Sequence, residues 1–273
     1  MHDATMTFFG LTQHAFTTLP PEPYLDPSRQ QAFEKLQSLV ARRGFAVICG
    51  PSGSGKTALL HYLAGTLNEN HHRLIYVPFA FLEKGQMLQY LAGRMGLEPK
   101  RGISACLRTI QQHLHTMQPV NPVIVLDEVE QLETNTSHLL RCLLHDRSDT
   151  SHHCTVILAG AESFIEQTLR LQVHEPLRQR ITLYLKLQGL DAAATAAYIT
   201  HHLHSAGSRN ELFEVPAVQL IHELSNGLPR IIGTLAEAAM DSAATARRQT
   251  VTLDDVHAVA ENVLPPHLAQ VAS

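Results

Sequence analysis

One stretch of eight residues constrains the fold of this chain more than any other: Gly50-Pro51-Ser52-Gly53-Ser54-Gly55-Lys56-Thr57. It fits G-x-x-x-x-G-K-[ST], a pattern whose glycines let successive backbone N–H groups turn toward a phosphate. The apolar run at residues 45–49 predicts a buried strand before the loop, and residues 58–64 predict a helix after it, with its positive end toward the loop. This order predicts a phosphate-binding loop and disfavours the alternative, a simple Gly/Ser-rich turn.

A second motif supplies partners for the phosphate loop. Residues 123–126 are apolar and lead directly into Asp127 and Glu128. As a Walker B motif, this strand would deliver Asp127 to a Mg²⁺ ion that Thr57 also ligates, and Glu128 would activate the attacking water as general base. Lys56 would reach the β- and γ-phosphates. The alternative is a solvent-facing acidic pair that caps the next helix. We therefore expect ATP and Mg²⁺ as cofactors.

The remaining pattern predicts a parallel α/β sheet followed by helices alone. Further strands are expected at residues 74–77, 123–126, 154–159 and 181–185, and helices at 29–43, 84–95, 104–117, 136–146 and 162–171. Alternation of strands and helices is typical of a parallel sheet, here of five strands. After Gly189 only helices are expected, at residues 191–204, 215–225, 229–247 and 252–263. The expected divisions are an extended N-terminal arm at 1–26, where prolines and aromatics cluster, a P-loop NTPase core at 27–188, a helical lid at 189–264 and a tail at 265–273.

The composition excludes several other classes of protein. A net charge of −4 argues against a protein permanently coated with DNA, because counterion-driven binding needs many exposed cations. The four cysteines are scattered without a C-x-x-C pair, so neither a disulfide framework nor a zinc knuckle is expected. The 18 histidines are interpreted as solvated surface residues rather than metal ligands. No signal peptide or long apolar segment occurs, so we expect a cytoplasmic protein without a membrane partner.

Two arginine-bearing segments are candidates for phosphate contacts. Arg178 and Arg180 lie just before the last expected strand, where one could stabilise charge on the nucleotide of a neighbouring subunit. Arg180 is preferred because it directly abuts the strand, and a surface arginine pair is the alternative. Gly227-Leu228-Pro229-Arg230 opens a helix of the lid. If the lid folds over the nucleotide, Arg230 contacts its phosphates; otherwise the segment is an ordinary helix start.

Together with Phe8-Phe9-Gly10-Leu11, these motifs resemble those of the ExeA-type AAA+ ATPases, near the transposition regulators TnsC, TniB and MuB, over roughly residues 8–263. The resemblance implies a five-stranded core with a helical lid, nucleotide between subunits, and ATP-dependent assembly of a homo-oligomer, either ring or filament. It also implies that Arg180 lies in the segment that carries the arginine finger, and that Arg230 corresponds to the sensor arginine of the lid. Tyr24 would border the adenine, and a packing role is the alternative.

One departure from the family pattern concerns hydrolysis. Relatives carry a polar residue, often Gln, just after the fourth strand, where it can order the attacking water. Ala161 stands there in this chain. We therefore expect slow hydrolysis, or that another group takes this role.

Three functions are compatible with these features. The first is a transposition helper that assembles on duplex DNA without sequence preference and recruits or licenses a transposase. The second is an ExeA-like secretion-associated ATPase, and the third a nucleotide-gated switch with little turnover. Secretion members are expected to continue into a transmembrane segment and a wall-binding domain, and the chain's end at Ser273 favours the first function. For the first function, the candidate DNA contacts are Lys84, Arg94, Lys100, Arg101 and Arg108. The alternative is that these residues form a solvated helical face.

Overall fold

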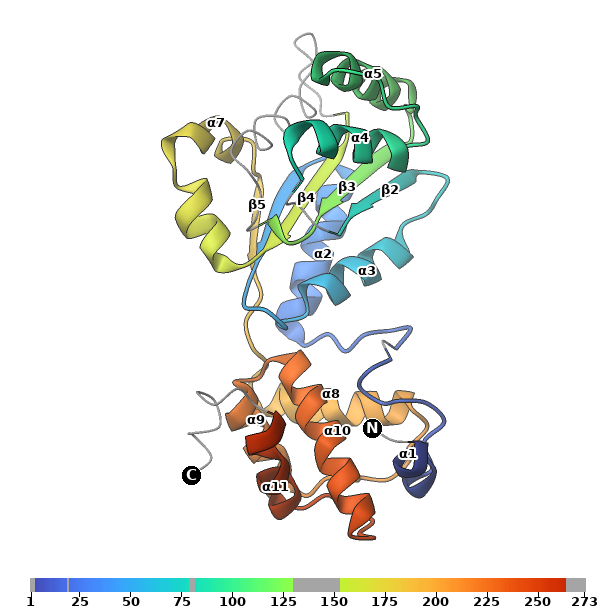
Figure 1. Ribbon diagram of the computed structural model, residues 1–273, viewed down its shortest axis with the longest axis vertical. Coiled ribbons are helices and arrows are strands. Elements are labelled where there is room, and N and C mark those ends of the chain that lie inside the picture. The colour runs from blue at the N-terminus through green and yellow to red at the C-terminus, as the bar shows by residue number, and fades with distance from the viewer. Residues whose placement is uncertain (1–2, 19, 79–81, 130–152, 264–273) are drawn as a thin grey trace. The chain divides into compact units, whose positions relative to one another are not determined.

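The computed structural model describes residues 3–18, 20–78, 82–129 and 153–263 (Figure 1). The chain divides into two compact units. The first, here called the sheet unit, comprises residues 28–50 and 59–187. The second, the helical unit, comprises residues 1–27, 51–58 and 188–273, so that most of the phosphate loop groups with the helices.

The sheet unit is built on a parallel five-stranded sheet with the order β2-β3-β4-β1-β5 (Figure 1). The strands are β1 (Phe45–Cys49), β2 (His72–Val77), β3 (Asn121–Leu126), β4 (Thr155–Gly160) and β5 (Leu183–Lys186). All residues of β1, β3 and β4 are buried, as expected for strands covered on both faces. This confirms the predicted parallel sheet, and each predicted strand overlaps an observed one.

Helices cover both faces of this sheet. Residues of α4 (Lys84–Arg94) and α5 (Ile103–Thr116) share one core with alternate strand residues, among them Phe45, Ile75 and Ile124. Because successive strand residues point to opposite faces, the residues between them face the other layer. That layer contains α2 (Pro27–Ala41) and α3 (Lys56–Thr66), which meet where the rings of Phe33 and Tyr62 lie 4.8 Å apart.

The segment between β4 and β5 differs from the single helix expected at residues 162–171. It forms a π-helix (Phe164–Leu169), a 3₁₀ turn (Gln172–His174) and a short α7 (Glu175–Arg178). A π-helix closes hydrogen bonds between residues five apart, and it places Phe164 and Leu169, both buried, on the core side. The helix expected at residues 136–146 lies outside the described residues.

The helical unit contains α8 (Ala192–Ser205), α9 (Val215–Ser225), α10 (Pro229–Thr245) and α11 (Leu253–Val263), which confirms the predicted helices after Gly189 (Figure 1). It also contains α1 (Asp3–Phe9). The prediction of an extended arm over residues 1–26 was therefore wrong for residues 3–9, which form a helix. The helix-breaking prolines lie beyond this turn, and burial of Phe9 in the helical core stabilises it. The tail at 265–273 lies outside the described residues.

After α1, the N-terminal segment runs along α8 and α10. The Thr12 amide and hydroxyl donate to the Ala206 carbonyl (2.8 and 3.0 Å), and the Thr17 hydroxyl donates to Glu237 (2.8 Å). The His202 ring stacks on Phe16, with its Nδ1 2.8 Å from the Ala15 carbonyl oxygen. Burial lowers the pKa of His202 below its ordinary value. The segment is thus part of the helical core.

Among the residues that the structure describes, no helix combines the length and the apolar character needed to cross a membrane.

Candidate nucleotide site

The phosphate loop has the backbone that its sequence requires. Gly53 and Gly55 have φ angles of +79° and +94°, a region that side-chain-bearing residues rarely adopt. The Ser54 amide donates to the Pro51 carbonyl (3.2 Å), and α3 then begins at Lys56. The Lys56 ammonium donates to the Pro51 carbonyl (3.0 Å), across the loop. Such alternation of backbone conformations turns amide groups toward a common point, where an anion binds.

Within the helical unit, the loop meets the start of α10. The Arg230 amide donates to the Gly53 carbonyl (3.3 Å). A Cβ atom added to Gly53 would lie 2.9 Å from the Cβ of Arg230. The Arg230 side chain is exposed, with no side-chain hydrogen bond or ion pair to other described residues. The structure thus brings the predicted sensor arginine to the phosphate loop, with its guanidinium available.

A close backbone contact fixes the turn before Arg230. Gly227 has a φ angle of +69°, and its carbonyl accepts a hydrogen bond from the Leu190 amide (2.7 Å). A Cβ atom at Gly227 would lie 1.9 Å from the Leu190 carbonyl oxygen. Only glycine fits at position 227, because its backbone packs directly against that of Leu190. This contact explains the glycine of the Gly-Leu-Pro-Arg segment.

The Walker B acids lie at the end of β3. Asp127 is 5% exposed, and its Oδ1 accepts a hydrogen bond from the Glu128 amide (3.0 Å). Glu128 is exposed and has a φ angle of +55°, which costs a non-glycine residue about 1–2 kcal/mol. Such strain is concentrated at functional sites. The backbone thus directs one acid into the protein and the other out of it.

Tyr76 on β2 contacts this site, and no sequence motif predicted it. Its hydroxyl donates to Asp127 Oδ2 (2.7 Å). Alternation along β2 could have indicated it, because Ile75 and Val77 face the core shared with α4 and Tyr76 therefore faces the opposite layer.

At the neighbouring strand end, Ala161 follows β4 and Glu162 follows Ala161. Glu162 forms an ion pair with Lys186, the last residue of β5 (2.8 Å). The hydrogen bond and the negative charge of Glu162 raise the pKa of Lys186. Because β1 lies between β4 and β5, this pair spans the end of the strand that leads into the phosphate loop. The acid next to Ala161 is thus engaged in an ion pair.

The two candidate finger arginines differ in their contacts. The Arg178 guanidinium donates to the carbonyls of Leu169 and Leu171 (2.5 and 3.2 Å), which end the π-helix segment. The half-buried Arg180 makes no side-chain hydrogen bond or ion pair within the described part of the chain. The structure therefore gives Arg178 a local structural role and leaves the Arg180 guanidinium available.

Tyr24 lies in the helical unit. Its ring packs edge-on against Tyr198 of α8 (centroids 6.1 Å apart) and lies 5.9 Å from the His201 ring. These contacts account for its partial burial. A role at the adenine remains a prediction.

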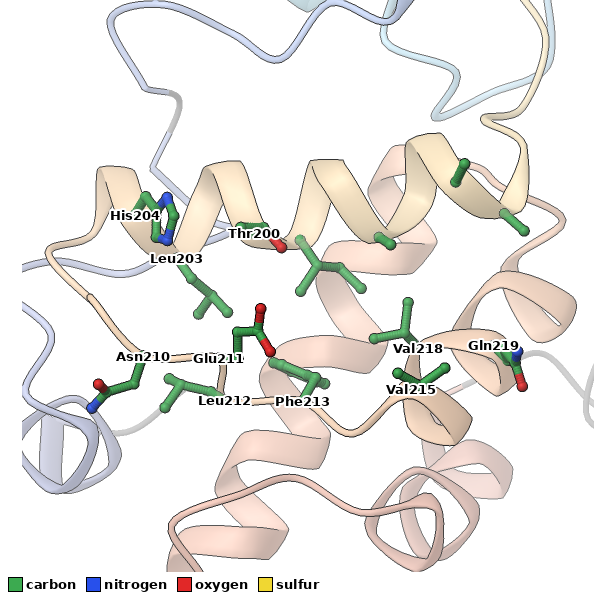
Figure 2. Close-up of a pocket in the computed structure, with 14 residues that line it drawn as sticks. Thr200, Leu203, His204, Asn210, Glu211, Leu212, Phe213, Val215, Val218 and Gln219 are labelled. Atoms are coloured by element: carbon green, nitrogen blue, oxygen red, sulfur yellow. The ribbon is translucent and has the colours of Figure 1, made fainter.

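The helical unit also contains an apolar groove of about 370 Å³ between α8 and the segment that leads into α9 (Figure 2). Ile199, Leu203, Leu212 and Val218 line it, and Figure 2 shows the Glu211 carboxylate directed toward α8. Its largely aliphatic lining and acidic side chain do not suit a phosphate. The groove is thus distinct from the phosphate loop.

Comparison with known proteins identifies the class to which the fold belongs. The model of a family described as AAA domain matches residues 40–169. Cdc6p of Pyrobaculum aerophilum superposes with a TM-score of 0.73 at 16% identity, over 95% of this chain and 71% of the other. RuvB of Thermotoga maritima, a Holliday junction branch migration motor, does so with a TM-score of 0.56 at 22% identity, over 88% and 71%. The fold is that of the AAA+ P-loop NTPases.

Among individual proteins, the chain is similar to general secretion pathway protein A of Aeromonas hydrophila. The two are 27% identical over 263 residues, which cover 94% of this chain and 48% of the relative. The chain thus spans about half the length of the curated relative that it matches.

The residues present are of the kinds that would hold a nucleotide and a magnesium ion. Gly53 and Gly55 adopt the positive φ angles of a phosphate-binding loop, and Asp127 offers carboxylate oxygens, which Mg²⁺ prefers. Gly50 and Asp127 directly follow β1 and β3, whose carboxyl ends share one edge of the parallel sheet. When bound, Mg²⁺ neutralises charge that develops on the phosphates.

Proposed function

We propose that this chain is an ATPase that binds ATP with Mg²⁺ and hydrolyses it between the subunits of a homo-oligomer. The observation that carries the proposal is the shared sheet edge from which Gly50 and Asp127 emerge. Gly50 to Thr57 hold the phosphates, with Lys56 at the β- and γ-phosphates. Thr57 and Asp127 hold the metal, and Glu128 accepts a proton from the attacking water.

Substitution of Glu128 tests hydrolysis separately from binding. Glu128→Gln should keep the affinity for a fluorescent ATP analogue, while phosphate release falls at least about 100-fold because the general base is lost. Glu69→Gln, an exposed acid in a loop, should match the original chain in both measurements. Unchanged phosphate release in Glu128→Gln would remove Glu128 from the mechanism. A slow basal rate is expected, since Ala161 supplies no polar group and Glu162 is held by Lys186.

The cellular role we propose is that of a DNA-assembled helper, which in transposition would recruit or license a transposase. The supporting feature is a group of basic residues in and between α4 and α5 of the sheet unit. Arg94 at the end of α4 and Arg108 on α5 are exposed, and Lys84 is half-buried. Lys100 and Arg101 lie exposed in the segment between the two helices. Lys100 pairs with Glu98 at 3.9 Å, a weak contact that leaves the cation accessible.

Solved structures with this fold include the ORC1 protein of Aeropyrum pernix in complex with DNA. It has a TM-score of 0.67 at 17% identity over 90% of this chain and 70% of that chain. That complex makes DNA a reasonable ligand to test here. The second candidate role, in secretion, is favoured by the similarity to general secretion pathway protein A.

A mobility shift with random duplex DNA distinguishes these roles. For the helper, binding requires ATP, weakens steeply with salt, and weakens further in Arg94→Ala/Arg108→Ala because phosphate contacts are lost. Arg42→Ala/Arg73→Ala, which removes two exposed arginines elsewhere in the sheet unit, serves as the control. Absence of a shift in every nucleotide state would favour the secretion role, or a nucleotide-gated switch if turnover is also absent.

A further inference from the structure

Tyr76 and Asp127 come from neighbouring strands and meet on one face of the sheet. In the parallel pair of β2 and β3, Tyr76 lies opposite Val125. Asp127, two residues further along, is therefore the diagonal neighbour of Tyr76, within reach of a long aromatic side chain. The Asp127 amide donates to the Val77 carbonyl (2.9 Å), which extends the ladder past β3. The backbone that carries the carboxylate is thus fixed by the sheet itself.

Each carboxylate oxygen of Asp127 accepts a hydrogen bond. Oδ1 accepts from the Glu128 amide at 3.0 Å, and Oδ2 from the Tyr76 hydroxyl at 2.7 Å. These two hydrogen bonds come from different parts of the chain and together fix the direction of the carboxylate. Hydrogen bonds of this kind orient a carboxylate that serves as a ligand for a divalent cation.

The hydroxyl of Tyr76 is itself held in place by packing. The His61 ring of α3 lies against the Tyr76 ring, with centroids 5.1 Å apart and planes at 38°. His61 is one helical turn after Thr57 on α3, so the two residues share a face of that helix. The helix that begins at the phosphate loop therefore braces the ring whose hydroxyl contacts the Walker B acid.

We infer that Tyr76 is a positioning residue for the magnesium ligand Asp127. The inference rests on the proposed function, in which Asp127 contributes to the metal site. The Tyr76 hydroxyl donates to Oδ2 and thereby restrains the rotamer of Asp127. Hydrogen-bond partners of metal-binding carboxylates typically change metal affinity about 10–100-fold when they are removed.

Tyr76→Phe tests this inference, because phenylalanine keeps the ring against His61 and removes only the donor. The affinity of the full chain for a fluorescent ATP analogue is measured as Mg²⁺ is titrated, and again in EDTA. We expect the Mg²⁺ concentration for half-maximal enhancement of binding to rise about 10–100-fold, with the affinity in EDTA unchanged. Tyr62→Phe is the matched control. Tyr62 packs against Phe33 in the same layer, and its hydroxyl forms no hydrogen bond with other described residues.

Each other outcome is decisive. An unchanged Mg²⁺ requirement in Tyr76→Phe overturns the inference and leaves nucleotide binding intact. Equal weakening with Mg²⁺ and in EDTA identifies a merely structural role and also overturns it. Failure of the original chain to bind nucleotide is a failure of the proposed function instead. If Tyr76→Phe does not fold, His61→Ala removes only the brace from an exposed position, and it should raise the Mg²⁺ requirement by a smaller factor. No change in that variant counts against the inference.

Discussion

The amide nitrogen of Arg230 lies 3.3 Å from the carbonyl oxygen of Gly53, so that the first turn of α10 is hydrogen-bonded to the phosphate loop. The contact leaves no room for a side chain, since a Cβ atom on Gly53 would lie 2.9 Å from the Cβ of Arg230. A residue at position 53 thus affects both the loop's conformation and its distance from the proposed sensor arginine.

Gly53→Ala should weaken nucleotide binding and destabilise the fold by about 1–3 kcal/mol, because alanine is strained at positive φ and crowds Arg230. Denaturant unfolding and nucleotide titration measure the two effects. Gly65→Ala is the control, since a Cβ there meets nothing within 4 Å and lies in α3. It should be neutral or stabilising. Stability and affinity equal to those of the original chain in Gly53→Ala would contradict the described contact.

Gly227→Ala should cost more, about 2–5 kcal/mol, because it combines strain at positive φ with an approach of 1.9 Å to the Leu190 carbonyl oxygen. The carbonyl belongs to backbone and cannot rotate away. A thermal melt should show a clear loss of stability, whereas Gly93→Ala, in α4 with open space around it, should not. A wild-type melting temperature for Gly227→Ala would show that the turn can rearrange.

Arg180→Ala should reduce turnover about 1,000-fold if the arginine acts on a neighbour's nucleotide, with little loss of stability. Mixing Arg180→Ala with Glu128→Gln subunits should restore part of the activity, since one site then contains both intact groups. Arg178→Ala should instead destabilise the fold by about 1–2 kcal/mol, because it loses contacts to Leu169 and Leu171. If Arg180→Ala turns over normally, Arg180 is not a finger.

Stability should fall as the pH drops below 6.5, because burial lowers the pKa of His202 in the folded chain from that ordinary value. Below pH 6.5 the His202 side chain is protonated more readily in the unfolded chain than in the folded chain. The stabilisation present above pH 6.5 is therefore lost as the pH falls toward the pKa of His202 in the folded chain. His202→Gln should be less stable overall but should lose less stability between pH 7.5 and 5.5. His204→Gln, exposed on the same helix, should keep the original pH dependence. An equal pH response of His202→Gln and the original chain would rule out His202 as a contributor.

The sheet could be predicted from the sequence because its central strands are short apolar runs between turn residues. The strand ends were missed where polar residues or proline begin a strand, as Asn121 and Pro122 do in β3. The π-helix at Phe164 was not predictable, since its sequence also suits an α-helix and only the core decides which residues are buried. Residues 3–9 are helical because Phe9 packs in the core of the helical unit against residues far away in sequence.

For the site, the motifs predict residues that lie at fixed local spacing, such as Gly53, Lys56 and Asp127. They could not identify Tyr76, whose contact depends on the register between two strands. Nor could the motifs distinguish Arg178 from Arg180. The two arginines have a similar sequence context, and they differ because only Arg178 donates hydrogen bonds to the carbonyls of Leu169 and Leu171.

The N-terminal segment has a consequence for how the protein can be handled. Removal of residues 1–24 would strip Phe16 and Tyr24 from α8 and leave the rings of Tyr198 and His202 facing water. Such a bared aromatic surface promotes self-association. We expect the shortened chain to aggregate at concentrations at which the full chain stays dispersed, a difference that light scattering would detect.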